Sequence, residues 1–219
     1  MTATLDFEAA RQAMINSQLR PNRLIDERLI EAFEKLPREE FVPKELRGIA
    51  YVDEDLPLGG GRYLMEPMVL ARMVQAGQIG ADDTVLVVGC ATGYGAAIAA
   101  ELAGTVIALE QDPDFVRRAT ETLAGLGIAN VAVVEGELVQ GMADQGPYDV
   151  ILLEGAVNEV PEALLDQVAE GGRLVTVVRR DGIGQLTVFS RRGGIGERTL
   201  FDAATPLLPG FEKKKSFVF

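Results

Sequence analysis

The sequence contains no histidine, and this absence removes several kinds of chemistry. Without imidazole there is no histidine-ligated metal site, no Ser–His–Asp or Cys–His nucleophile, and no histidine acting as a general acid or base. Cys90 is the only cysteine, so a disulfide within the chain is impossible, and a reducing, cytoplasmic location is expected. We expect Cys90 to fill space in a tight turn rather than to react.

Long apolar runs and positive charge are also scarce. No apolar stretch reaches the roughly 18 residues that a membrane span needs, and the amino terminus lacks a basic region followed by an apolar one. The net charge is −12 at pH 7, which argues against non-specific nucleic-acid binding. The basic run Lys213–Lys215 is interpreted as a solvated face. We therefore expect neither a membrane, nor a nucleic acid, nor a metal as a ligand.

What the chain does contain is 219 residues, 47% of them hydrophobic, enough for one large globular domain or one domain with a small extension. Its most informative stretch runs from Thr84 to Glu110. Thr84–Val88 is apolar and β-branched, as in a parallel strand covered on both faces, and Thr105–Leu109 predicts a second strand. Between them lie a glycine-rich turn and a helix predicted over Ala96–Leu102.

The glycine-rich turn is suited to a ligand, because Gly89, Ala91 and Gly93 let the main chain approach closely. Glu110 lies 21 positions after Gly89, close to the ~20 expected of an acid that binds a ribose hydroxyl. Tyr94 interrupts the dinucleotide spacing G-x-G-x-x-G, which disfavours an oxidoreductase. The spacing G-x-A-x-G instead resembles motif I of the S-adenosylmethionine-dependent methyltransferases. The alternative is an ordinary strand–helix–strand unit in which Glu110 is a surface or capping residue.

Helices and strands alternate along the rest of the chain. Helices are predicted over Phe7–Gln18, Asp26–Lys35, Met68–Gln75, Pro113 to Gly125 or Gly127, and Pro161–Glu170. Further strands are predicted over Val131–Glu135, Asp149–Leu153, Arg173–Val178, Gln185–Arg192 and Thr199–Leu208, and Phe217 and Phe219 near the end are expected to be buried. This order predicts an α/β fold with a doubly wound, mostly parallel sheet and a late antiparallel hairpin.

The segment Leu36–Pro67 is long, irregular and rich in proline, glycine and charge, which in a compact domain indicates a functional segment. We expect residues 1–75 to form a helical and substrate-loop extension of a Rossmann-like domain at 76–219, the two making one compact globule. In a doubly wound sheet the ligand lies beyond the carboxyl ends of the strands, where the strand order reverses. Candidate contacts are therefore the glycine turn, Glu110, and the turns after the third and fourth strands.

The third strand is followed by Gly136 and Glu137. A carboxylate there can accept a hydrogen bond from an adenine amino group, or it can simply lie in solvent. The fourth strand is followed by Glu154 and two small residues, Gly155 and Ala156, which would leave room for a substrate.

Several segments resemble, in order and spacing, the protein-L-isoaspartate O-methyltransferase family. They are LPREEFVP at Leu36–Pro43, YVDEDLPLGGGRYLMEP at Tyr51–Pro67, VLARM at Val69–Met73, VLVVGCATGYGAAIAAEL in the glycine-turn unit, EGE at Glu135–Glu137, YDVILLEGA at Tyr148–Ala156 and VPEALLDQVAEGGRLV at Val160–Val175. The resemblance covers about Gln12 to Arg192, most of the chain. It implies a methyltransferase fold, S-adenosyl-L-methionine as methyl donor, and a protein or peptide carrying isoaspartate as substrate, whose methylation starts repair.

The resemblance also implies roles for particular residues. Gly89, Ala91 and Gly93 would hold the methionine end of the cofactor, Glu110 the ribose and Glu137 the adenine, with Tyr94, Gly136 and Glu154 as further cofactor contacts. Arg62 with the Gly59–Gly61 backbone, together with Met65 and Glu66, would face the substrate. The reaction fits a chain without histidine, because a carboxylate with a reference pKa of about 3.9 is already ionised at pH 7 and needs no general base. The protein mainly has to align the reacting atoms and exclude water.

Four positions depart from the family's pattern. Met65 stands where the family has Ser or Thr, and Glu66 where it has Gln. A carboxylate at Glu66 facing a substrate carboxylate at ~4 Å would repel it by about 4 kcal/mol at an effective dielectric of ~20, whereas Arg62, commonly Gln in the family, would supply a compensating positive charge. Val87 replaces a strand acid that helps hold the methionine end, a task that Glu110 and Glu154 would then share.

These departures leave two alternatives open beside isoaspartyl methylation. The chain could methylate a neutral or cationic acceptor, toward which the charge of Glu66 would be favourable. It could also be a catalytically silent binding or scaffold protein that kept the fold.

Overall fold

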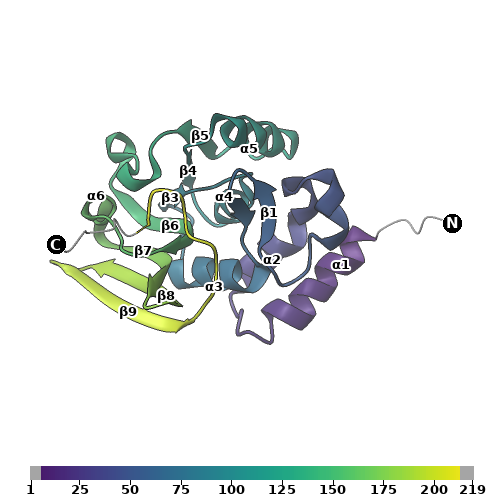
Figure 1. The fold of residues 1–219 in the computed structure, drawn as a ribbon, viewed down its shortest axis with the longest axis horizontal. Helices are drawn as coiled ribbons and strands as arrows, with labels where there is room; N and C mark the ends of the chain where they lie inside the picture. Colours follow the sequence, from purple (N-terminus) through teal and green to yellow (C-terminus); the bar gives the residue numbers. More distant parts are fainter. Residues whose placement is uncertain (1–5, 213–219) are drawn as a thin grey trace, which may run out of the picture.

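The computed structural model describes residues 6–212, which form one seven-stranded sheet covered by helices and a helical amino-terminal region (Figure 1). The strands are β3 (Thr84–Val88), β4 (Thr105–Glu110), β5 (Val131–Glu135), β6 (Tyr148–Val157), β7 (Val168–Arg180), β8 (Ile183–Arg191) and β9 (Ile195–Asp202). Their order is β5-β4-β3-β6-β7-β8-β9, parallel from β5 to β7 and antiparallel for β8 and β9. This arrangement confirms the predicted doubly wound α/β fold with a late antiparallel hairpin.

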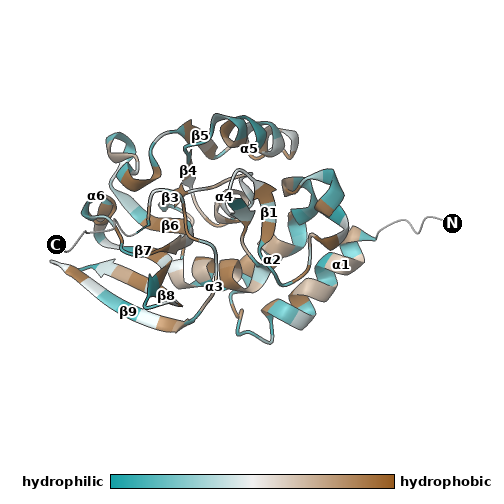
Figure 2. Cartoon of the chain, viewed as in Figure 1, coloured by the Kyte–Doolittle hydropathy of each residue, from teal (hydrophilic) through white to brown (hydrophobic). Residues whose placement is uncertain are grey.

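The central strands are buried on both faces, which explains why they read as continuous apolar runs. Alternate residues of β3 face opposite sides of the sheet: Val85 and Val87 belong to one apolar cluster and Leu86 and Val88 to the other. All four are fully buried. Figure 2 shows hydrophobic colour on the central strands and α3 and hydrophilic colour along much of α5. The strand order reverses at β3, between β4 and β6, so a ligand site is expected there.

The α-helices of the described residues are α1 (Phe7–Met14), α2 (Glu27–Lys35), α3 (Pro67–Gly77), α4 (Tyr94–Ala100), α5 (Pro113–Gly125) and α6 (Glu162–Leu165). Asp6, Asp26 and Asp112 cap α1, α2 and α5 by accepting hydrogen bonds from main-chain N–H groups of the first turn. After α1 the chain continues as one π-helical turn, Ile15–Leu19, so the single helix predicted over Phe7–Gln18 is two joined pieces.

The segment Leu36–Pro67, predicted to be irregular, contains two 3-10 turns and a hairpin. The 3-10 turns are Arg38–Phe41 and Lys44–Ile49, and the hairpin pairs β1 (Leu56–Gly59) with β2 (Arg62–Leu64). Gly59, Gly60 and Gly61 all have positive φ at the tip of this hairpin, a conformation that glycine adopts at little cost. The run of three glycines is therefore the turn of a short hairpin.

Two boundaries near the carboxyl terminus were predicted wrongly. The helix expected over Pro161–Glu170 ends at Leu165, because the chain from Val168 onward pairs in parallel with β6. The strand expected over Thr199–Leu208 starts earlier and ends at Asp202, after which residues 203–211 leave the sheet edge and run back across the molecule (Figure 1). We call residues 203–211 the strap. Lys213–Lys215, Phe217 and Phe219 lie outside the described residues.

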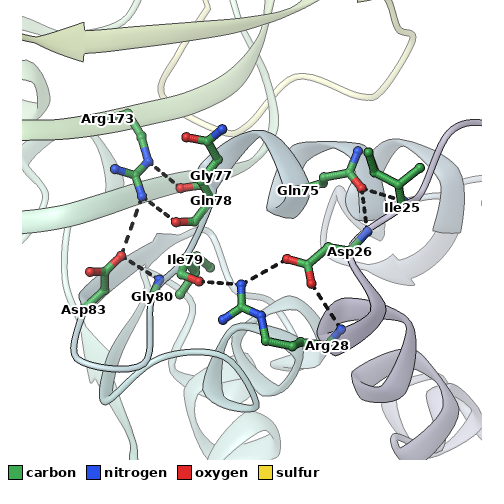
Figure 3. Close-up of polar contacts among 10 residues, drawn as sticks. All are labelled: Ile25, Asp26, Arg28, Gln75, Gly77, Gln78, Ile79, Gly80, Asp83 and Arg173. Atoms are coloured by element: carbon green, nitrogen blue, oxygen red, sulfur yellow. Dashed lines mark hydrogen bonds and ion pairs between the residues drawn. The ribbon is translucent and has the colours of Figure 1, made fainter.

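The amino-terminal helices are joined to the sheet by a shared core and by polar contacts. Phe33 of α2 lies edge-on to Tyr94 of α4, with ring centroids 6.2 Å apart. Figure 3 shows Gln75 of α3 accepting hydrogen bonds from the main-chain N–H groups of Ile25 and Asp26. Arg28 donates to the carbonyl of Ile79, just before the first core strand. Residues of the amino-terminal region thus contact both α3 and α4.

Candidate active site

The glycine turn lies between β3 and α4, at the point where the strand order reverses. Gly89 and Cys90 donate hydrogen bonds to the carbonyl of Leu109 at 2.8 and 3.2 Å, which fixes the turn against β4. Ala91 and Gly93 have positive φ, 47° and 92°, so the turn needs residues with small side chains. Cys90 is fully buried, and burial raises the pKa of its thiol well above the ordinary value, in agreement with a packing role.

Tyr94 was expected to contact the cofactor, but its ring is fully buried in the core. It packs edge-on against Phe41 at 5.1 Å between centroids, and the guanidinium of Arg38 lies 5.0 Å above it. Burial raises the pKa of Tyr94 to about 12. The residue at this position therefore anchors the amino-terminal region to α4, and its ring does not line the ligand side of the turn.

Glu110 ends β4 and has no solvent exposure. One carboxylate oxygen accepts a hydrogen bond from the N–H of Ala91 at 2.9 Å. The other accepts from the N–H groups of Gln111 and Asp112 at 2.9 and 3.2 Å. A carboxylate has about four acceptor positions, so main-chain donors already take three of them.

Arg62 was expected to face the substrate, but the structure places it against Glu110. Its guanidinium is 4% exposed, forms an ion pair with Glu110 at 3.1 Å, and donates to the carbonyl of Gly89 at 2.6 Å. A buried carboxylate needs a counter-charge, and Arg62, the first residue of β2, supplies it. The positive charge of Arg62 is therefore paired with Glu110.

Glu154, on β6, lies on the other side of Arg62. Its Oε1 atom is buried and has no hydrogen-bond partner among residues 6–212, and it stands so close to Gly95 that a Cβ there would collide with it. Burial raises the pKa of Glu154 to about 8; Arg62 opposes this shift and Glu110 adds to it. Val87 is fully buried in the core.

Met65 and Glu66 lie together in the turn between β2 and α3, as the sequence predicts. Met65 is 4% exposed, and its carbonyl accepts a hydrogen bond from Arg38 at 2.7 Å. Glu66 is half-buried and donates its N–H to Asp55 at 3.0 Å. The pKa of Glu66 is raised to about 7, first by burial and then by the charges of Asp55, Asp53 and Glu54. The candidate substrate turn is therefore surrounded by negative charge.

Gly136 and Glu137 follow β5, at the edge of this region. The N–H of Gly136 donates to the carbonyl of Glu110 at 3.0 Å, which places the turn beside the end of β4. Glu137 is exposed. The structure thus brings the glycine turn, Glu110, Arg62 and Glu154 together, with Gly136 at their edge, and it leaves Glu137 in solvent.

Leu208, which could not be predicted as a site residue, lies at the centre of the site. Leu208 belongs to the strap and is 2% exposed. A Cβ placed on Gly89 would stand 2.7 Å from its Cδ2 atom, and one on Gly155 would stand 2.6 Å from its Cγ atom. The strap was predicted as the end of an edge strand, so its return to the carboxyl ends of β3 and β6 could not be foreseen from local pattern.

Little space remains at this site. The cavity between the β2 hairpin, Glu154 and the strap measures about 10 Å³ and is lined by Gly61, Arg62, Tyr63, Met65, Glu154, Gly155 and residues 205–208. A small-molecule or cofactor site typically measures about 300–1,000 Å³. In the described conformation the residues therefore do not fit S-adenosylmethionine, although the turn and acid that would hold it are present.

A cavity of about 780 Å³ lies elsewhere, beside the turn between β7 and β8, and its lining includes Arg180, which pairs with Glu197 at 2.7 Å. Among residues 6–212 no group of three or more metal-ligating side chains is gathered. Within the same range, no helix has the length and apolar character to cross a membrane.

Comparison with known proteins identifies the family. The family model for protein-L-isoaspartate(D-aspartate) O-methyltransferase matches residues 9–201. A protein-L-isoaspartate O-methyltransferase of Methanoculleus marisnigri is 42% identical over 168 residues, covering 77% of this chain and 76% of the relative. Protein-L-isoaspartate O-methyltransferase 2 of an Anaeromyxobacter species is 40% identical over 181 residues, covering 83% of this chain and 74% of the relative.

Solved structures agree with this family and with its fold. A protein-L-isoaspartate O-methyltransferase superposes with a TM-score of 0.79 at 25% identity, covering 91% of this chain and 66% of that one. A beta-aspartate methyltransferase of Plasmodium falciparum, solved in complex with S-adenosyl-L-homocysteine, has a TM-score of 0.78 at 20% identity and covers 93% of this chain and 98% of that one. The chain has the Rossmann-like fold of S-adenosylmethionine-dependent methyltransferases and belongs to the protein-L-isoaspartate(D-aspartate) O-methyltransferase family.

Proposed function

We propose that this chain is an S-adenosylmethionine-dependent protein-L-isoaspartate O-methyltransferase, which methylates the isoaspartyl carboxylate of damaged proteins or peptides. The observation that carries the proposal is membership of the family over residues 9–201, on a fold whose strand order reverses at the glycine turn. The absence of histidine is compatible with it, because the substrate carboxylate is ionised at neutral pH without a base. A cytoplasmic location remains our expectation.

The residues of this chain would bind and orient rather than transfer protons. Gly89, Ala91 and Gly93 offer main-chain surface, and Glu110 offers a carboxylate at the end of β4. Glu137 is exposed beyond β5, where it could accept a hydrogen bond from an adenine amino group. These roles require Arg62 and the strap to move, since both now occupy the ligand side of the turn.

A second candidate function keeps the reaction but changes the acceptor. Glu66 lies among Asp53, Glu54 and Asp55, and these charges contribute to its raised pKa of about 7. The same charges would repel an isoaspartyl carboxylate and attract a cationic acceptor, or leave a neutral one unaffected. The acidity of this turn is the observation that supports a neutral or cationic methyl acceptor as the second candidate.

Methyl transfer to defined peptides separates the two candidates. The assay uses radiolabelled S-adenosylmethionine at saturating concentration and three matched peptides, carrying isoaspartate, ordinary aspartate, and a neutral or lysine side chain at the same place. We expect transfer to the isoaspartyl peptide alone. We also expect the double variant Met65→Ser/Glu66→Gln to be at least ~10-fold faster, because it removes a repulsion of up to about 4 kcal/mol and restores a hydroxyl.

The other results are equally informative. Transfer only to the neutral or lysine peptide would establish the second candidate and reject isoaspartyl methylation. No transfer to any of the three peptides, by either protein, would contradict both candidates and leave a non-catalytic binding protein of the same fold.

A further inference from the structure

We infer that this chain closes its own cofactor site with Arg62 and Leu208, so that S-adenosylmethionine and S-adenosylhomocysteine bind only in competition with these two side chains. The inference rests on the proposed function, because it concerns the place where the cofactor of that reaction would bind. Three observations support it: the partners of the Glu110 carboxylate, the position of the Leu208 side chain, and the hydrogen bonds of the strap.

The carboxylate of Glu110 has four partners within the chain. Three main-chain N–H groups donate hydrogen bonds to it, and the guanidinium of Arg62 forms an ion pair with it at 3.1 Å. A ribose hydroxyl could reach Glu110 only by replacing one of these partners. The three N–H groups belong to the turns that define the site, so Arg62 is the partner that can leave. Its departure would also free the carbonyl of Gly89.

Two glycines lie beside Leu208 at this site. Gly89 and Gly155 have no side chains, which in a nucleotide-binding turn allows a ligand to touch the main chain. In this chain the space beside both is taken by Leu208, whose side-chain atoms stand where a Cβ on either glycine would be in collision. Leu208 is 2% exposed, so it fills the space as a core residue does.

The strap that carries Leu208 is held in place by specific bonds. The N–H of Leu208 donates to the carbonyl of Ala156, and the N–H of Ala156 donates to the carbonyl of Pro206, both at 2.8 Å. The hydroxyl of Thr205 donates a hydrogen bond to the carboxylate of Asp55, just before β1, at 3.3 Å. Figure 1 shows this part of the chain passing from β9 to the ends of β3 and β6. The closure is therefore a defined, paired conformation of the chain itself.

Calorimetric titration with S-adenosylhomocysteine tests the inference. The proteins are the wild type, Arg62→Gln, Leu208→Ala and the double variant, with Arg28→Gln and Leu126→Ala as matched controls away from the site. We expect the double variant to bind at least ~10-fold more tightly than the wild type, each single variant to lie between them, and both controls to match the wild type. Equal, micromolar binding by the wild type and the double variant would overturn the closure.

Two further readouts keep the result decisive. If Arg62→Gln fails to fold because Glu110 loses its counter-charge, Leu208→Ala alone still has to bind more tightly than the wild type. Hydrogen exchange of the amides of Ala156 and Leu208 in the wild type should speed up when S-adenosylhomocysteine is added, since the strap must leave. Unchanged or slower exchange on binding, or no binding by any variant, would reject the inference.

The outcomes for closure and for function are distinct. Tight binding by the wild type, with methyl transfer, would overturn the closure and support the proposed function. Binding gained by the double variant, without methyl transfer to any peptide, would support the closure and contradict the proposed function.

Discussion

The Oε1 atom of Glu154 is buried and has no hydrogen-bond partner among the described residues. It lies near the ion pair that Arg62 forms with Glu110. The pKa of Glu154 in the folded chain is about 8, against an ordinary value of 4.5, chiefly because of burial. A folded-state pKa above the unfolded one means that the folded chain holds the proton more tightly. The contribution of Glu154 to stability is therefore complete below pH 4.5 and is lost as the pH rises toward 8.

The substitution Glu154→Gln should remove this pH dependence, because the amide cannot ionise. We expect the variant to match the wild type in unfolding free energy near the ordinary pKa and to exceed it by about 3 kcal/mol at pH 7. Urea unfolding at several pH values between about 4 and about 8 measures the difference. Glu137→Gln, at an exposed glutamate, is the control and should show no such trend. A constant difference between Glu154→Gln and the wild type across this range would contradict the assignment.

Single residues also show how far the sequence predicts the site. The glycine turn and Glu110 could be placed, because their spacing along one strand–helix–strand unit sets their positions in space. The ion pair of Arg62 with Glu110 could not be predicted, because it depends on how a separate hairpin packs against the end of β4. The burial of Tyr94 was also missed, since the first residue of a helix after a turn can face either the ligand or the core.

At the scale of elements, the junction of α3, β3 and β7 depends on Arg173. Figure 3 shows its guanidinium donating to the carbonyls of Gly77 and Gln78 at the end of α3, and it lies 3.6 Å from Asp83 before β3. These contacts satisfy carbonyls that have no partner within the helix. Arg28, in the same view, bonds to Asp26 and to the carbonyl of Ile79 but is far more exposed, 56% against 20% for Arg173.

We expect Arg173→Met to lower the unfolding free energy by about 1–3 kcal/mol, because it leaves two helix-end carbonyls and a carboxylate without their partner. Arg28→Met removes a comparable set of bonds from an exposed place and should cost less than ~1 kcal/mol. Urea unfolding of both variants at neutral pH makes the comparison. Equal losses would mean that the junction does not depend on Arg173 in particular.

Elements near the carboxyl terminus were harder to predict than those in the centre. Strands β3 and β4 lie in apolar runs bounded by turn residues, so their limits followed from local pattern. From local sequence alone, residues 168–170 could either continue a helix or start a strand. They form a strand because this part of the chain pairs with β6. The strap has no regular pattern of its own, and its place is set by bonds to Ala156, far away in the sequence.

At the scale of the whole molecule, one apolar cluster runs from the amino-terminal helices through α3 and α4 to the strands. Met14 and Phe33 belong to it together with Val87 and Tyr94, all at most 1% exposed. Because residues 6–75 and the sheet share this cluster, we propose that they fold as one unit. The division at residue 75 is then a boundary in the sequence only.

Unfolding in urea should therefore occur in a single transition. Far-ultraviolet circular dichroism follows the helices and sheet, and near-ultraviolet dichroism follows the tyrosines, among them Tyr94 at the junction with the amino-terminal region. We expect the two curves to coincide. An earlier loss of the tyrosine signal would indicate that the amino-terminal region separates before the sheet unfolds.

Leu208 must leave its place before a nucleoside can enter, and this order of events governs the rate of binding. The observed association rate then levels off at the rate of opening as the cofactor concentration rises. The apparent dissociation constant equals the intrinsic one divided by the fraction of open molecules, so an opening present in one molecule in ~100 weakens binding ~100-fold. Variation at the strap could therefore tune cofactor occupancy over a wide range while the glycine turn and Glu110 stay unchanged.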